Sequence, residues 1–289
     1  MTFTRIDGTL SVVGAAPDGD SVRFTPNRAD AWRAAGLAVR ANPHGGVQLR
    51  LDAIDALETH YAPPQRTSAA MLHQPLPLAH AAAEELLRLV GFTAVSRGAD
   101  EVVTAVTPAT VAASILTSGV DTYGRCVAFL LPAGAPLLGG DGTRVRVAPA
   151  DLSPSANAQL LATGLAYPTF YSGLYADLRT SLAGLASAAR DARSGVWAED
   201  RTTAGVEVTS LQVLTDSAVI LPKLFRRLAE YLALGSTSMA GFRAFLDARG
   251  DRVLVLPRGE VAPVSSVVAV DGEVVRLTTQ PDDLVFFEG

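Results

Sequence analysis

The chain shows its organisation most clearly in residues 47–59, Val47-Gln48-Leu49-Arg50-Leu51-Asp52-Ala53-Ile54-Asp55-Ala56-Leu57-Glu58-Thr59. The first half of this segment alternates apolar and polar side chains, as a β-strand with one buried face does. A fully extended strand would separate Arg50 from Asp55 by about 16 Å and place them on opposite faces. Arg50, Asp55 and Glu58 can therefore share a site only if the strand curves and the chain turns near Ile54.

Further strands and helices are expected on both sides of this segment. Strand patterns, enough with residues 47–54 for a small five-stranded barrel, lie at 9–13, 21–25, 101–106 and 125–131. Apolar residues at helical spacing predict helices over 78–90, 155–163 and 171–193. Thr107 as N-cap, Pro108 at N1 and Gly119 at C′ indicate an additional helix. The remaining segments, interpreted as loops, are 27–46, 61–77 and 132–154.

The composition becomes polar near residue 200, where Glu199 to Thr203 are charged or hydroxylated. Beyond it, apolar stripes ending at Gly235 and Gly250 predict two amphipathic helices. Short strand patterns around an Asp271-Gly272 turn follow. We therefore predict an α+β protein with two domains, residues 1–200 and a small C-terminal α+β domain, residues 201–289.

Composition bounds the function. The chain has 289 residues, 48% of them hydrophobic, so it can bury a substantial core. With 24 Lys and Arg against 29 Asp and Glu, its net charge of -5 gives no broad basic surface. No apolar run long enough for a membrane span and no secretory signal pattern is visible, and the one cysteine excludes an internal disulfide. We expect a cytoplasmic protein without a membrane partner.

Two more segments carry charged residues beside strands. Residues 17–24 place Asp18-Gly19 between two strand patterns, which is typical of a hairpin turn, and Asp20 follows. Residues 121–129, Asp-Thr-Tyr-Gly-Arg-Cys-Val-Ala-Phe, place Arg125 after a tight turn at the start of a strand. Each of these patterns is common when taken alone.

Together, the three segments resemble the staphylococcal nuclease family. In that family an Asp-Gly-Asp hairpin, an Arg-x4-Asp-x2-Glu-Thr strand and a Tyr-Gly-Arg strand start follow one another in this order. Residues 157–168 are similar to its second helix and Gly-Leu-Ala exit, and residues 188–197 to its last helix with a Gly-x-Trp end. The resemblance covers roughly residues 8–198, and we recognise no family in the rest of the chain.

This resemblance implies an OB-type five-stranded β-barrel with three helices, and calcium-dependent hydrolysis of phosphodiester bonds in DNA or RNA. Asp20 and Asp55 match the two calcium carboxylates, with the backbone carbonyl of Ala56 as a further ligand. Glu58 matches the acid that binds the metal through water and deprotonates the attacking water. Arg50 and Arg125 match the two arginines that clamp phosphate. Ca²⁺ prefers oxygen ligands, and a guanidinium can bind two phosphate oxygens, so these residue types suit that chemistry.

Other interpretations remain open. Ala56 and Leu57 stand where the family usually has Thr and Pro, and the overall charge is acidic. These departures favour a non-catalytic OB-fold module that binds nucleic acid or a protein partner. A third interpretation is a nuclease restrained in the cytoplasm by its own inserted loops or by residues 201–289, which are also a possible site for a protein partner. The basic residues of that part are expected on solvated helix faces rather than on phosphate: Lys223, Arg226, Arg227, Arg243 and Arg249.

Overall fold

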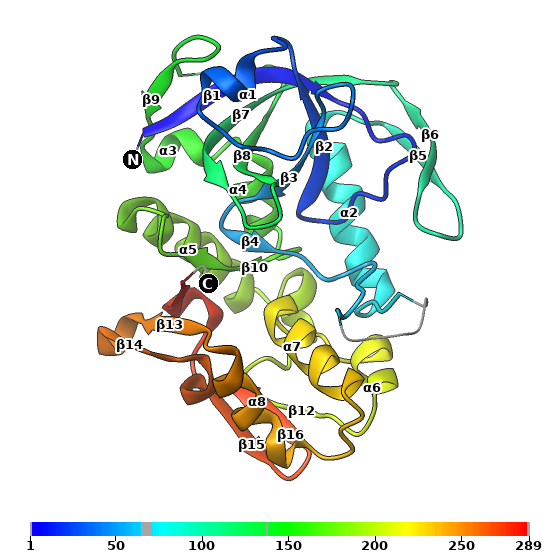
Figure 1. Ribbon diagram of the computed structural model, residues 1–289, viewed down its shortest axis with the longest axis vertical. Coiled ribbons are helices and arrows are strands. Elements are labelled where there is room, and N and C mark those ends of the chain that lie inside the picture. The colour runs from blue at the N-terminus through cyan, green and yellow to red at the C-terminus, as the bar shows by residue number, and fades with distance from the viewer. Residues whose placement is uncertain (1, 65–70, 137, 288–289) are drawn as a thin grey trace.

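The computed structural model describes residues 2–64, 71–136 and 138–287, so parts of the predicted loops 61–77 and 132–154 lie outside the described residues. The chain is a mixed α+β protein with a closed barrel at one end and a smaller helical and β-sheet part at the other (Figure 1). Within the described residues there are eight α-helices. No described helix has the length and apolar character needed to cross a membrane.

Five strands close the barrel, and they confirm the prediction of a small five-stranded barrel. Antiparallel pairs join the strands in the order β3, β2, β1, β7 and β8, and a parallel pair between β8 and β3 closes the ring. The barrel strands are β1 (Thr2–Leu10), β2 (Ser21–Pro26), β3 (Val47–Leu51), β7 (Val111–Val120) and β8 (Cys126–Pro132). A short strand, β9 (Arg144–Arg146), adds to the edge of β1.

The helix predicted after Thr107 is wrong, because this segment forms β7, the longest barrel strand. Residues 111–117 are mostly buried between β1 and β8, and seven of them pair with β1 in continuous register. The predicted strand 101–106 corresponds to β6 (Val103–Thr107), which pairs with β5 (Ala94–Arg97) outside the barrel. Helix cap residues were present here, but pairing on both sides of the strand overrides that local signal.

The three predicted helices of the first part are confirmed with shifted ends. They are α2 (Leu76–Val90), α4 (Ala156–Ala162) and α5 (Ala176–Asp191). Two one-turn helices, α1 (Ala31–Ala34) and α3 (Pro149–Leu152), are also present. Helix α2 ends at Gly91, which takes the left-handed conformation at φ 110°. Helix α4 begins at Ser155, whose side chain accepts a hydrogen bond from the Ala158 amide. Helix α4 packs against α2, α5 and β8, which fixes the helices around one side of the barrel.

The C-terminal part contains both predicted helices, as α7 (Pro222–Ala233) and α8 (Phe242–Arg249), and a further short helix, α6 (Leu211–Asp216). Its strands are β12 (Val206–Glu207), β13 (Arg252–Val255), β14 (Glu260–Pro263), β15 (Val268–Asp271), β16 (Val274–Leu277) and β17 (Leu284–Phe286). Strand β17 pairs in parallel with β11 (Phe170–Tyr171), a strand from the first part. The buried apolar side chains of both parts form one continuous cluster. The two parts are therefore packed together through a shared sheet and a shared core.

Candidate functional site

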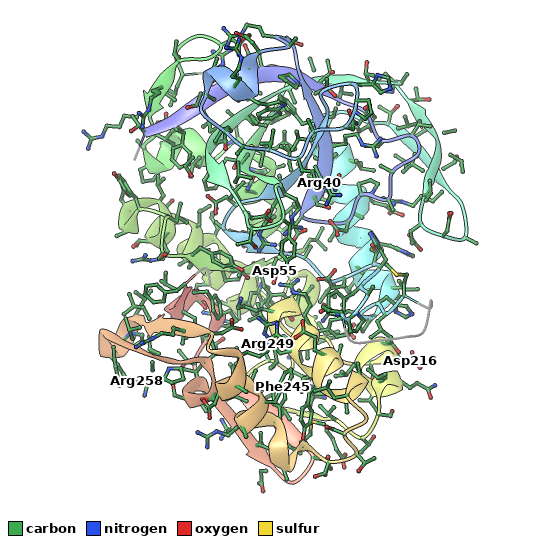
Figure 2. All side chains as sticks on the ribbon, in the orientation of Figure 1. Arg40, Asp55, Asp216, Phe245, Arg249 and Arg258 are labelled. Carbon is green, nitrogen blue, oxygen red and sulfur yellow. The ribbon has the colours of Figure 1, made fainter. Side chains whose placement is uncertain are left out.

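The turn after β3 brings Asp55 back toward Arg50. Ala53 has φ 67°, in the left-handed region, and the chain then forms β4 (Ile54–Asp55), which pairs with β10 (Tyr167–Pro168). This turn is what the sequence required for Arg50 and Asp55 to share a site. Asp55 lies where the barrel meets the C-terminal part, and its side chain is completely buried (Figure 2).

The segment around Asp20 lies against the same turn, and it is not the expected tight hairpin. Strands β1 and β2 pair up to Leu10 and Phe24, so the connection between them is long. A Cβ atom on Gly19 would lie 2.5 Å from Cβ of Ala56 and 2.6 Å from Cβ of Ala82, so only glycine allows this close approach. The Ala56 amide then donates a hydrogen bond of 3.4 Å to Asp20. Asp20 and the Asp55 segment are thus held side by side.

Gln74 ties the Glu58 backbone to the C-terminal part. Its side-chain oxygen accepts a hydrogen bond of 3.3 Å from the Glu58 amide, and its side-chain nitrogen donates one of 2.8 Å to the carbonyl of Ile220. Ile220 lies just before α7. The position of Glu58 therefore depends on the C-terminal part as well as on the barrel.

Arg226 of α7 contacts two of the three predicted site carboxylates, Asp55 and Glu58. Its Nη2 lies 2.7 Å from Oδ2 of Asp55, and its Nη1 lies 3.1 Å from Oδ1 of Asp55 and 2.5 Å from Oε1 of Glu58. The expectation that Arg226 lies on a solvated helix face is wrong, since only 22% of its side chain is exposed. The partners are about 170 residues apart in sequence, so no local pattern around either one indicates the other.

The carboxylates of the site respond differently to burial. Burial and the neighbouring Asp18 carboxylate hold the pKa of Asp20 well above its usual range. Burial also raises the pKa of Glu58, to about 7, although Arg226 opposes this rise. For Asp55, burial is outweighed by Arg226 and Arg50, which lower its pKa. Asp55 is therefore the permanent anion of the group.

Two cations face the open cleft beside this cluster. Arg50 and Lys223 lie near the ring of Tyr171, with Cζ of Arg50 at 5.5 Å and Nζ of Lys223 at 5.4 Å from the ring centroid. Neither has an ion-pair partner among the described residues, in contrast to Arg226. The cleft has a volume of about 700 Å³, and Asp20, Arg50, Glu58, Arg125 and Lys223 all line it. Asp55 and Asp20 favour the charged form of Arg50 without contacting it directly, and a guanidinium and an ammonium group free of direct ion pairs among the described residues suit an anionic ligand.

Arg125 lines the cleft but is held at the rim by its own turn. Its Nε donates a hydrogen bond of 2.7 Å to Asp121, four residues earlier, and its guanidinium lies 5.6 Å from the ring centroid of Tyr123. The Asp121 carboxylate also accepts hydrogen bonds from the amides of Tyr123 and Arg125. The structure thus brings Asp20, Arg50, Asp55 and Glu58 together and leaves Arg125 paired at the entrance.

A second charged cluster, which the sequence did not indicate, lines the C-terminal wall of the cleft. Arg227 contacts Glu230 at 3.0 Å and Asp251 at 2.5 Å, and Arg249 contacts Glu230 at 3.1 Å. The hydroxyl of Tyr61 donates a hydrogen bond of 2.9 Å to Glu230. Arg249 lies on the side of the C-terminal part that faces the barrel (Figure 2). These charges compensate one another and help hold α7 and α8 in place.

The oxygen ligands at this site are of the kind that calcium prefers, but Arg226 occupies the position that calcium would take at Asp55 and Glu58. Asp20, Asp55 and Glu58 supply hard oxygen atoms, and Ala56 is buried between them. Both oxygens of Asp55, however, accept hydrogen bonds from Arg226. Within the described ranges, no three His, Cys, Asp or Glu side chains are grouped to hold a metal ion. A guanidinium and a divalent cation would repel each other at these carboxylates, so the two occupants are alternatives.

A scan against protein-family models finds no matching family, and a search of curated proteins finds no matching relative.

Proposed function

We propose that the protein is a phosphodiesterase acting on DNA or RNA, with an OB-type barrel of the staphylococcal nuclease kind and the cleft described above as its active site. The observation that carries the proposal is the convergence of Asp20, Arg50 and Glu58 on one open cleft, with Asp55 directly behind them. The sequence motifs that contain these residues resemble those of the nuclease family in the same order.

The residues of the cleft divide the work of such a reaction. Arg50, which has no ion-pair partner among the described residues, binds the phosphate and stabilises charge that develops on its oxygens. Glu58, whose pKa is about 7 while Arg226 contacts it, can accept a proton from water once another cation replaces Arg226 and its carboxylate is free. Arg125 can reach the phosphate after it leaves Asp121. A divalent cation could be held by Asp20 and Asp55 only after Arg226 has left Asp55, and it would then neutralise the phosphate and lower the pKa of water.

The test is cleavage of labelled single-stranded DNA, duplex DNA and RNA, with calcium or with a chelator. Glu58→Gln and Arg50→Met are the informative variants, and Glu84→Gln on the exposed face of α2 is the control. Loss of one transition-state contact is expected to lower the rate about 100- to 1,000-fold. Arg226→Met is assayed in parallel, because Arg226 covers Asp55. No cleavage of any substrate by either the wild type or Arg226→Met would reject the proposal.

A second candidate is a non-catalytic module that binds nucleic acid through the same cleft. The contact of Arg226 with Asp55 and Glu58 favours it, because this contact gives both carboxylates a structural partner. Such a module would bind an oligonucleotide equally well with and without calcium and would leave it intact. Binding measured by fluorescence anisotropy, with cleavage measured on the same samples, separates the two candidates.

A further inference from the structure

The side chain that neutralises Asp55 comes from the C-terminal part. Asp55 has no exposed side-chain surface, and an isolated buried carboxylate is costly, so a cation must accompany it. Arg226 meets this need with one hydrogen bond to each Asp55 oxygen and a third to Glu58. The arrangement is the bidentate pairing for which arginine is suited and lysine is not.

The peptide group between Ile220 and Leu221, just before α7, is held on both sides and helps to position Arg226. The amide of Leu221 donates a hydrogen bond of 2.9 Å to the hydroxyl of Thr202, and the carbonyl of Ile220 accepts one of 2.8 Å from Gln74. Phe225, next to Arg226, is completely buried and lies edge-on to Tyr61, with their ring centroids 6.1 Å apart. The backbone that carries Arg226 is thus packed into the core, and its side chain is only 22% exposed.

We infer that Arg226 is a built-in substitute for a divalent cation at Asp55 and Glu58, and that it excludes calcium from the site as long as its guanidinium is bound there. A metal ion could use these oxygens only after the guanidinium had left, because both oxygens of Asp55 are already bonded to it and like charges repel. This inference rests on the proposed function only in naming a divalent cation as the alternative occupant. It goes beyond that function in assigning a role to a residue of the C-terminal part.

The experiment measures binding of Ca²⁺ by calorimetry and of Tb³⁺ by luminescence, without any substrate. Wild type is compared with Arg226→Met, which keeps the length of the apolar stem, and with Arg190→Met as a matched control. Arg190 also joins the two parts, through Asp282 at 2.7 Å, and its side chain is 24% exposed against 22% for Arg226. Arg226→Met is expected to bind calcium at least about 100-fold more tightly than wild type. This corresponds to a difference in binding free energy of about 2.8 kcal/mol, at 1.4 kcal/mol per tenfold change in Kd.

The melting temperature provides a second readout that does not depend on comparing affinities. Calcium should raise the melting temperature of Arg226→Met, because a ligand that binds only the folded state stabilises it. It should leave the wild type and Arg190→Met unchanged. If Arg226→Met does not fold, Arg226→Gln, which keeps hydrogen-bond donors, is measured in its place.

Equal calcium binding by wild type and by the Arg226 variants, or no binding by any of them, would overturn the inference. Failure of the proposed function gives a different result. In that case Arg226→Met gains calcium binding and thermal stabilisation but cleaves no nucleic acid.

Discussion

Replacing Arg226 by methionine should destabilise the folded protein strongly and in a pH-dependent way. The substitution keeps most of the apolar stem but removes the charge that pairs with Asp55 and Glu58, whose side chains are 0% and 12% exposed. Breaking a buried ion pair by removing one partner costs about 3–5 kcal/mol, because the other charge stays buried without compensation. We expect a loss of that size at pH 8. At pH 5 the loss should be smaller, because Glu58 is then protonated in the folded protein.

Urea unfolding followed by the fluorescence of Trp32 and Trp197 measures this loss, with the slope of the free energy against urea used to check that the folded state is unchanged. Arg190→Met, which breaks the less buried pair with Asp282, should cost about 1 kcal/mol. A double-mutant cycle of Arg226→Met with Glu58→Gln should give a coupling energy of about 1–3 kcal/mol. A loss below about 1 kcal/mol for Arg226→Met, or no coupling to Glu58, would refute the view that this buried pair joins the two parts.

Four further predictions concern other residues. The pKa of Glu58 is about 7 in the folded protein against an ordinary 4.5, so folding takes up a proton between these values and the free energy of unfolding falls as the pH rises through them. Glu58→Gln should therefore gain about 2–3 kcal/mol on wild type from pH 5 to pH 8 in urea unfolding, and parallel profiles would contradict this. Lys223 is the only lysine, so acetylation read by mass spectrometry should show it protected several-fold by an oligonucleotide bound with chelator present, whereas an unchanged rate would count against phosphate binding there. Asn157 donates to the carbonyls of Asp52 and Ala128 and accepts from the Leu130 amide, so Asn157→Ala should lose about 2–4 kcal/mol by urea unfolding, and a loss below 1 kcal/mol would be inconsistent with these bonds. A fragment of residues 1–200 should be poorly folded, because it lacks the apolar partners of β11; a sharp thermal transition by circular dichroism would show otherwise.

Local patterns predicted the elements whose signals are contained in a few adjacent residues. The end of α2 at Gly91 and the start of α4 at Ser155 follow from the backbone freedom of glycine and from side-chain capping. The turn near Ile54 was required by the spacing of Arg50 and Asp55, and Ala53 provides it. In these cases the physical cause lies within the segment itself.

The same reasoning failed where distant segments determine the outcome. Residues 107–119 contain helix cap residues, yet β1 and β8 pair with both edges of this strand. Arg226 lies on an amphipathic helix whose pattern is equally consistent with a solvated arginine. Its burial depends on Asp55 and Glu58, which belong to the barrel. A sequence pattern indicates which face of a helix is polar. It does not indicate which carboxylate from a distant part of the chain will contact that face.

This distinction changes which residues argue for catalysis. The presence of all five predicted charged site residues indicates a working site only if burying each charge without metal or phosphate would destabilise the protein. These residues are Asp20, Arg50, Asp55, Glu58 and Arg125. Arg226 outweighs the cost of burial for Asp55 and only opposes it for Glu58, and Asp121 pairs with Arg125. Arg50 is different, because it faces the cleft beside Lys223 with no ion-pair partner among the described residues. An anionic ligand is therefore expected at these two cations, and hydrolysis requires that Glu58 become free of Arg226.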